Sequence, residues 1–119
     1  MSALAGLRVL LVEDEPIIAM TAEDMLRAIG CDVVACAQTL AEALAAANRG
    51  GFDVAMLDIN LNGEASLPVA DDLKAAGTPF IFSTGYGADG CGPHRDVPLV
   101  TKPYRTIDLE QALARALGR

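Results

Sequence analysis

The chain has 119 residues, a formal net charge of −7 and a hydrophobic fraction of 52%, which suit one compact domain with its own core. The acidic balance argues against binding of DNA or RNA through phosphate neutralisation, and against contact with an anionic membrane surface. No apolar run reaches the roughly 18 residues of a membrane span, and residues 1–6 do not resemble the start of a signal peptide, so a cytoplasmic protein is expected.

Short apolar runs alternate with longer amphipathic stretches along the chain. The first strand is predicted over 8–12, where residues 9–12 are continuously apolar, as in a parallel strand buried on both faces. Pro16 suits the first turn of the helix that follows, and Gly30 is expected to end it. The second strand is predicted over 32–37. These two strands and their connecting helix already favour a parallel sheet.

The middle of the chain continues the alternation. Thr39 is predicted to cap a helix through residue 48, with Glu42 placed for a capping box, and two glycines end that helix. The third strand is predicted over 52–57. A third helix is expected within residues 68–76.

The last third of the chain contains two strands and one clear helix. The strands are predicted over 80–83 and 97–100, and the final helix is predicted to start near Thr106 or Asp108. Residues 85–96 between the strands are rich in glycine, which does not favour a helix interior, so a helix there is expected to be short, frayed or missing. His94, the only histidine, is expected to be a solvated loop residue.

Polar residues follow four of the predicted strands. Glu13 and Asp14 follow the first strand and Asp58 follows the third; Thr84 follows the fourth and Lys102 the fifth. Because ligands of open parallel sheets bind at the carboxyl ends of the strands, we expect these groups to converge at one edge. Each residue alone is an ordinary loop residue, and it is their joint order that favours a functional site.

Three converging carboxylates repel one another and therefore call for a divalent cation. Ligands that are all oxygen favour Mg²⁺, with Mn²⁺ as a substitute, over zinc. We expect Asp14 and Asp58 to coordinate the metal directly and the backbone carbonyl of Asn60 to supply a third oxygen. Glu13 is expected to act through a metal-bound water.

A carboxylate beside Mg²⁺ can attack phosphorus and form an aspartyl phosphate. Phosphoryl transfer needs positioning and charge neutralisation more than covalent help from the protein. The Lys102 ammonium is expected to neutralise the phosphoryl oxygens together with the metal, and the Thr84 hydroxyl to hydrogen-bond one of them. The residues and their order thus predict a phosphoryl acceptor.

Four stretches of the sequence resemble the receiver domain of bacterial two-component response regulators. They are residues 9–16 (VLLVEDEP), 57–61 (LDINL), 83–86 (STGY) and 101–104 (TKPY). The resemblance covers essentially the whole chain, so residues 1–119 are interpreted as one receiver domain without an output domain. It implies a flavodoxin-like (βα)5 α/β fold with a parallel five-stranded sheet in the order 2-1-3-4-5, the order that a chemotaxis member of the family has.

The resemblance also implies roles for the strand-end residues. Asp58 becomes the phosphoacceptor, Glu13 and Asp14 the acidic pair, Thr84 the switch hydroxyl and Lys102 the lysine that such domains share. The donor is then a histidine kinase or a histidine phosphotransfer protein. Such a chain is a signalling phosphoacceptor, not an enzyme, and catalyses only its own phosphorylation and slow dephosphorylation. A monomer or weak dimer is expected.

One position departs from the usual receiver pattern. Leu99 stands three residues before Lys102, where typical receivers carry Tyr or Phe. With the stretch 79–86, this resembles the subgroup named for a Phe-Ala-Thr-Gly motif, often stand-alone regulators of alphaproteobacteria. We expect ordering of residues 85–93 to replace the usual switch. The predicted switch region comprises Thr84, Gly85, Tyr86, Leu99 and Tyr104.

Other interpretations stay open at this point. The chain could be a receiver excised from a hybrid histidine kinase, or a small Mg²⁺-dependent phosphatase, although Asn60 stands where such enzymes usually have a second acid. Residues 85–90 match a dinucleotide-binding pattern, but no helix is predicted directly after them. The sequence does not decide between binding of an unknown downstream protein and draining of phosphoryl groups from a shared kinase. It also leaves open whether the Lys102–Pro103 bond is cis.

Overall fold

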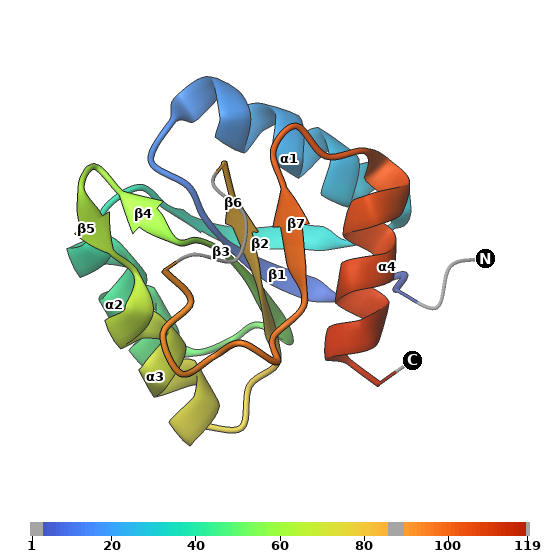
Figure 1. Cartoon of the computed structure of the whole chain (residues 1–119). Helices are drawn as coiled ribbons and strands as arrows, with labels where there is room; N and C mark the ends of the chain where they lie inside the picture. Colours follow the sequence, from blue (N-terminus) through green and yellow to red (C-terminus); the bar gives the residue numbers. More distant parts are fainter. Residues whose placement is uncertain (1–3, 86–89, 119) are drawn as a thin grey trace.

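The computed structural model describes residues 4–85 and 90–118, and shows a sheet with helices on both faces (Figure 1). The strands of this sheet lie in the order β2-β1-β3-β6-β7 and are all parallel. They are β1 (Arg8–Val12), β2 (Asp32–Ala37), β3 (Val54–Asp58), β6 (Phe80–Thr84) and β7 (Leu99–Thr101). The predicted order 2-1-3-4-5 is confirmed, since β6 and β7 are the fourth and fifth predicted strands.

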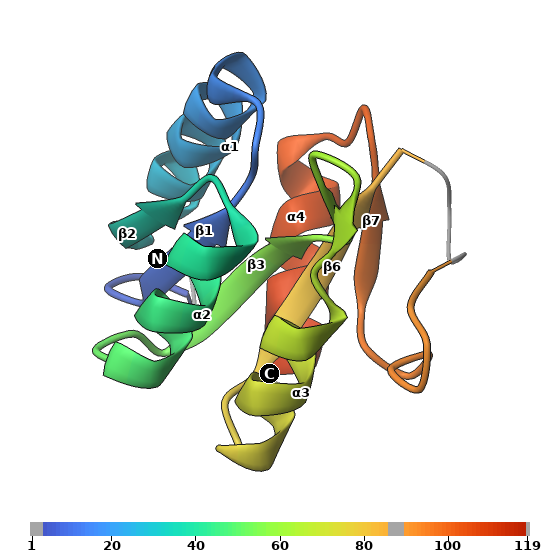
Figure 2. The same ribbon diagram turned by 90° about the vertical axis from the view of Figure 1, so that its left-hand side faces the viewer.

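The helices divide between the two faces of the sheet. They are α1 (Pro16–Ile29), α2 (Leu40–Arg49), α3 (Leu67–Ala75) and α4 (Thr106–Ala116). Helices α1 and α4 pack on one face and α2 and α3 on the other; in Figure 2, α2 and α3 lie towards the viewer and α4 lies behind the sheet. Across the residues that the structure describes, none of the helices has the length and apolar character needed to cross a membrane.

The core consists of two apolar layers, one on each face. Alternate residues of the central strands point into opposite layers, so that Val9 and Leu11 join α1 and α4, while Leu10 and Val12 join α2 and α3. Every residue of β3 is buried. The continuous apolar runs of the sequence are therefore the parts of the sheet covered on both faces.

The predicted capping and helix-ending residues lie at the ends of α1 and at the start of α2. Pro16 is the first residue of α1, and Gly30 ends it in the left-handed region with a φ of 105°. The Thr39 hydroxyl accepts a hydrogen bond from the Glu42 N–H at 3.1 Å. The Glu42 carboxylate in turn accepts from the N–H of Gln38 at 2.8 Å, one residue before the expected partner.

Several element boundaries differ from the prediction by one or two residues. The third strand begins at Val54 and not at residue 52, because Gly51 still turns the chain with a φ of 88°. The fifth begins at Leu99 and not at 97: Pro98 has no N–H to donate, and the N–H of Val97 donates to the carbonyl of His94 at 3.3 Å. Helix α3 is shifted one residue earlier.

A short antiparallel hairpin, not predicted from the sequence, follows β3. Its strands are β4 (Asn60–Leu61) and β5 (Glu64–Ala65). The two residues between them, Asn62 and Gly63, have φ values of 53° and 86°. An Asn-Gly pair is the commonest sequence of such a two-residue turn, so the signal was present in the sequence.

The connection between β6 and β7 is irregular. Its described residues, 85 and 90–98, contain no helix, in agreement with the expectation for this segment. The prediction for His94 was wrong: its side chain is buried, and its ring packs against the rings of Phe80 and Phe82. The described residues of this connection place no helix over these two rings, and an imidazole with an apolar body covers them instead.

Candidate functional site

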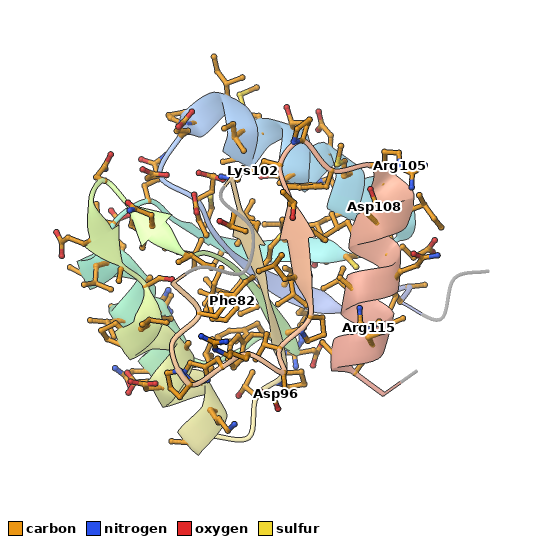
Figure 3. All side chains as sticks on the ribbon, viewed as in Figure 1. Phe82, Asp96, Lys102, Arg105, Asp108 and Arg115 are labelled. Atoms are coloured by element: carbon orange, nitrogen blue, oxygen red, sulfur yellow. The ribbon has the colours of Figure 1, made fainter. Side chains whose placement is uncertain are left out.

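The carboxyl ends of the strands meet around one open cavity of about 730 Å³. Asp58 ends β3 and Thr84 ends β6, while Asp14 follows β1 by two residues and Lys102 directly follows β7. These four residues and Asn60 line the cavity. Figure 3 shows Lys102 at this end of the sheet, away from Phe82 in the core. The structure thus brings together the strand-end residues that the sequence singled out.

Lys102 joins the two buried carboxylates of the site. Its Nζ donates to Glu13 Oε1 at 2.8 Å and to Asp58 Oδ2 at 2.9 Å. Its backbone N–H donates to the carbonyl of Thr84 at 2.8 Å, which continues the pairing of β6 with β7. The Lys102–Pro103 peptide bond is cis. One ammonium group therefore compensates two carboxylates in the interior of the site.

The acidic cluster has the donor set of a magnesium site. Glu13, Asp14 and Asp58 each offer a carboxylate oxygen, and these oxygens all lie within 4.8 Å of one another. Glu13 and Asp58 are buried, and Asp14 is partly exposed at the cavity. Three clustered carboxylates with one lysine leave excess negative charge, and oxygen donors suit a hard divalent cation. The residues present therefore fit Mg²⁺.

Backbone N–H groups hold the carboxylates in place. Asp14 Oδ2 accepts from the N–H of Asn62 at 2.9 Å, so the β4–β5 hairpin is tied to the acidic pair. Asp58 Oδ1 accepts from the N–H of Asn60 at 3.3 Å. The Asn60 side chain accepts from the N–H of Gly63 at 2.7 Å and closes the turn of the hairpin. Asn62 is thus a site residue that the sequence reasoning missed.

The pKa values of the two neighbouring acids, Glu13 and Asp14, shift in opposite directions. Burial, reinforced by hydrogen bonds with Asp58 and Asp14, raises the pKa of Glu13 to about 7, against the lowering effect of the Lys102 ammonium. Burial also acts to raise the pKa of Asp14, but hydrogen bonds with Glu13 and from Asn62 outweigh it and lower that pKa. The more exposed acid is therefore the one that stays ionised.

Lys102 keeps its charge in this setting. Burial acts to lower its pKa, but hydrogen bonds to Glu13 and Asp58 outweigh burial and raise the pKa above the ordinary value. Burial likewise raises the pKa of the nearby Tyr104 phenol to about 12, so this hydroxyl is neutral at physiological pH. The site thus presents one fixed cation next to the Asp58 carboxylate.

Two of the predicted switch residues, Leu99 and Tyr104, lie on opposite faces of the sheet. Thr84 is buried at the end of β6, whereas Leu99 packs half-buried against the layer that contains Phe82. Tyr104 packs against the layer of α1 and α4 and lines a groove beside α1. Tyr86 lies outside the described residues. Leu99 and Tyr104 therefore face different layers of the core.

Comparisons with known proteins agree with this geometry. A family model described as the response regulator receiver domain matches residues 9–114. The phyllosphere-induced regulator PhyR of Methylorubrum extorquens is 34% identical over 116 residues, which cover 92% of this chain and 43% of PhyR. The chain thus spans less than half the length of this curated relative.

Solved structures extend the likeness over nearly the whole chain. The solution structure of SdrG from Sphingomonas melonis Fr1 is 44% identical, with a TM-score of 0.84, and the match covers 98% of this chain and 99% of SdrG. The receiver domain of the sensor histidine kinase PA1611 from Pseudomonas aeruginosa PAO1 is 25% identical, with a TM-score of 0.81 and coverage of 97% and 100%. That crystal structure has a magnesium ion coordinated in its active site cleft.

Proposed function

The chain belongs to the response regulator receiver domain family, and from that premise we propose that Asp58 accepts a phosphoryl group from a phosphohistidine, with Mg²⁺ bound at the acidic cluster. The observation that carries the proposal is the position of Asp58 between the Lys102 ammonium and the acidic pair formed by Glu13 and Asp14. A histidine kinase or a histidine phosphotransfer protein would be the donor, which places the exchange in the cytoplasm.

The residues of the cluster divide the chemistry among them. Asp14, Asp58 and the backbone carbonyl of Asn60 would hold the metal, and Glu13 would act through a metal-bound water. The magnesium ion in the PA1611 receiver domain supports this choice of metal. Bound Mg²⁺ supplies neutralisation of the phosphoryl oxygens.

The transfer step needs a nucleophile, a leaving group and charge neutralisation. An Asp58 carboxylate oxygen attacks phosphorus, the phosphorus–nitrogen bond of the donor histidine breaks, and the imidazole leaves after taking up a proton. Lys102 Nζ, now 2.9 Å from Asp58 Oδ2, is placed to hold a phosphoryl oxygen. The Thr84 hydroxyl would donate to another.

A surface for the donor protein adjoins the site. Ile17 and Met20 on α1 are 79% and 68% exposed, which is unusual for large apolar side chains. Ile17 lines an apolar groove of about 390 Å³ together with Tyr104 and Lys102, and Lys102 also lines the cavity around Asp58. This continuity supports α1 as the face against which the phosphohistidine-bearing donor docks.

The output of the phosphorylated chain has two candidate forms. A downstream protein can bind the changed conformation, or the chain can drain phosphoryl groups from a shared kinase. In either form Asp58 is a phosphoacceptor, and the chain catalyses only its own phosphorylation and slow dephosphorylation. Steady turnover of small phosphoesters would instead favour the phosphatase alternative.

The decisive experiment is intact mass after incubation with acetyl phosphate and Mg²⁺. We expect the wild-type chain to gain one phosphoryl group that is alkali-labile. We expect no gain in Asp58→Asn, or in the wild type when a chelator removes the metal. A gain that persists in Asp58→Asn would place the acceptor elsewhere. No gain from acetyl phosphate or from a panel of histidine kinases would reject the proposed function.

A further inference from the structure

A buried histidine occupies the face of the sheet between β6 and α3. The His94 side chain is only 3% exposed, although it belongs to an irregular connection. Its ring centroid lies 5.8 Å from that of Phe80 and 6.3 Å from that of Phe82, both in edge-to-face arrangements. Such contacts are those of a core aromatic residue. The phosphoryl transfer described above has no use for this residue.

One polar contact ties this ring to helix α3. His94 Nε2 lies 2.7 Å from Asp71 Oδ1, whereas Nδ1 is buried without a hydrogen-bond partner. A carboxylate only accepts hydrogen bonds, so Nε2 carries the proton and donates it. The Asp71 side chain is 64% exposed, so the aspartate reaches in from the surface of α3. The contact is therefore the sole polar bond that this buried ring has within the part of the chain that the structure describes.

The same segment also forms a wall of the phosphoacceptor cavity. Gly90 lines that cavity together with Asp58 and Ile59. A Cβ atom at Gly90 would lie 3.2 Å from Cγ2 of Ile59, so its backbone is pressed against the residue that follows the phosphoacceptor. Between this wall and the imidazole, the N–H of His94 donates to the carbonyl of Cys91 at 3.0 Å. Residues 90–94 thus connect the cavity to the Asp71 contact.

We propose that the His94–Asp71 hydrogen bond is a positioning contact that holds residues 90–94 in a fixed place as one wall of the open cavity beside Asp58 and so slows hydrolysis of the aspartyl phosphate. The part about hydrolysis rests on the proposed function; the part about the wall does not. In hydrolysis a water oxygen attacks phosphorus and the bond from phosphorus to the Asp58 oxygen breaks. The carboxylate is released together with inorganic phosphate and a proton. A wall that moves more often leaves room more often for a water molecule to take the attacking position beside phosphorus.

Asp71 offers a mild way to break the contact. Because its side chain is exposed, Asp71→Ala removes the acceptor without opening a cavity in the core. Asp71→Asn removes the same charge but keeps the Oδ1 acceptor, so it isolates the hydrogen bond from the charge. Asp72→Ala is the matched control, because Asp72 is the next residue of α3, is exposed and carries the same charge.

The test measures two quantities on each variant. The first is the lifetime of the phosphoryl group after removal of acetyl phosphate, followed by intact mass. The second is amide exchange at His94 and Val97, whose N–H groups bond to Cys91 and His94. We expect Asp71→Ala to shorten the lifetime about fivefold and to speed exchange by a similar factor, as the loss of one hydrogen bond implies. Asp71→Asn and Asp72→Ala should behave as the wild type, and all variants should bind Mg²⁺ equally.

The outcomes separate this inference from the proposed function. Equal lifetimes in Asp71→Ala and Asp72→Ala overturn the role in hydrolysis, and equal exchange rates overturn the anchoring of the wall. A lifetime in Asp71→Asn as short as in Asp71→Ala would assign the effect to charge and also overturn the proposal. If the wild type accepts no phosphoryl group, the proposed function fails, and the exchange rates alone decide whether the contact holds the wall.

Discussion

The pKa of Glu13 reflects the balance between burial and the neighbouring charges of the site. Its carboxyl group is almost fully buried and lies 2.8 Å from Lys102 Nζ, yet the pKa is raised to about 7, because burial outweighs the ammonium. A carboxyl group with a folded-state pKa above its unfolded value of 4.5 binds its proton more tightly in the folded protein. Its contribution to stability is therefore complete below pH 4.5 and is lost as the pH rises through about 7.

Glu13→Gln should therefore stabilise the metal-free protein at alkaline pH. We expect its free energy of unfolding in a chelator at pH 8 to exceed that of the wild type by about 1–3 kcal/mol, since each pKa unit is worth about 1.4 kcal/mol. The difference should shrink towards pH 4.5, and urea unfolding at several pH values measures it. Glu15→Gln, at an exposed neighbouring position, should show no such trend. A constant difference between Glu13→Gln and the wild type at all pH values would contradict this explanation.

At the scale of elements, α1 combines a core face with an exposed apolar face. Ala22, Leu26 and Ile29 are buried against the sheet, while Ile17 and Met20 remain exposed beside the site. A surface helix normally carries polar residues on its outer face. The exposed apolar residues lie in the first turns of the helix, next to the groove that Lys102 shares with the cavity. This arrangement suits contact with another protein, as the proposed phosphoryl transfer requires.

Ile17→Glu should separate the protein donor from the small-molecule donor. We expect phosphorylation by a histidine kinase or phosphotransfer protein to slow at least tenfold, because a charge replaces an apolar contact in the proposed docking face. Phosphorylation by acetyl phosphate should keep the wild-type rate, since the cavity is unchanged. Val34→Glu, which adds the same charge at an exposed apolar position of β2, is the control. Equal loss with both donors would place the effect in the cavity and not at the docking face.

At the scale of the molecule, the charged residues of the site lie at one end of the sheet, where the strands end. Part of the net charge of −7 lies at this edge, in the three clustered carboxylates. Lys102 pairs with two of them, Glu13 and Asp58. Strands β1, β3, β6 and β7 and the β4–β5 hairpin all contribute to this edge. Metal binding is therefore coupled to the folded arrangement of the whole sheet, because the unfolded chain does not hold these groups together.

Magnesium should raise the thermal stability of the protein in a concentration-dependent way. Binding to the folded state alone stabilises by about 2.7 kcal/mol at a ligand concentration one hundred times Kd, so Tm should rise steadily with added MgCl₂. Asp14→Asn should lose most of this rise, because it removes one of the carboxylates that line the cavity. Asp24→Asn, at an exposed position of α1, should keep it. An equal rise in all three proteins would show that Mg²⁺ acts elsewhere.

The amino-acid sequence by itself determined the strands of the main sheet, the helices and the residue types that gather at the site, whereas the β4–β5 hairpin was not predicted. Apolar runs separated by Pro16, Gly30, Thr39 and the paired glycines predicted where strands and helices begin and end, because capping and turn preferences are local properties of the chain. The acids, the lysine and the threonine were recognisable because each follows a predicted strand by one or two residues. The resemblance to receiver domains was confirmed by the match over residues 9–114.

Only the tertiary structure decided which groups touch. The bridge from Lys102 to Glu13 and Asp58 spans 89 and 44 residues of chain, and no local pattern specifies it. The same holds for Asn62, whose N–H reaches Asp14 across 48 residues, and for His94, which sequence reasoning placed in solvent. The His94 imidazole is buried because it covers the rings of Phe80 and Phe82 on this face, and because Asp71 accepts the hydrogen bond of its Nε2–H. Burial depends on what the rest of the fold leaves uncovered, and that is a property of packing between distant segments, not of the residue itself.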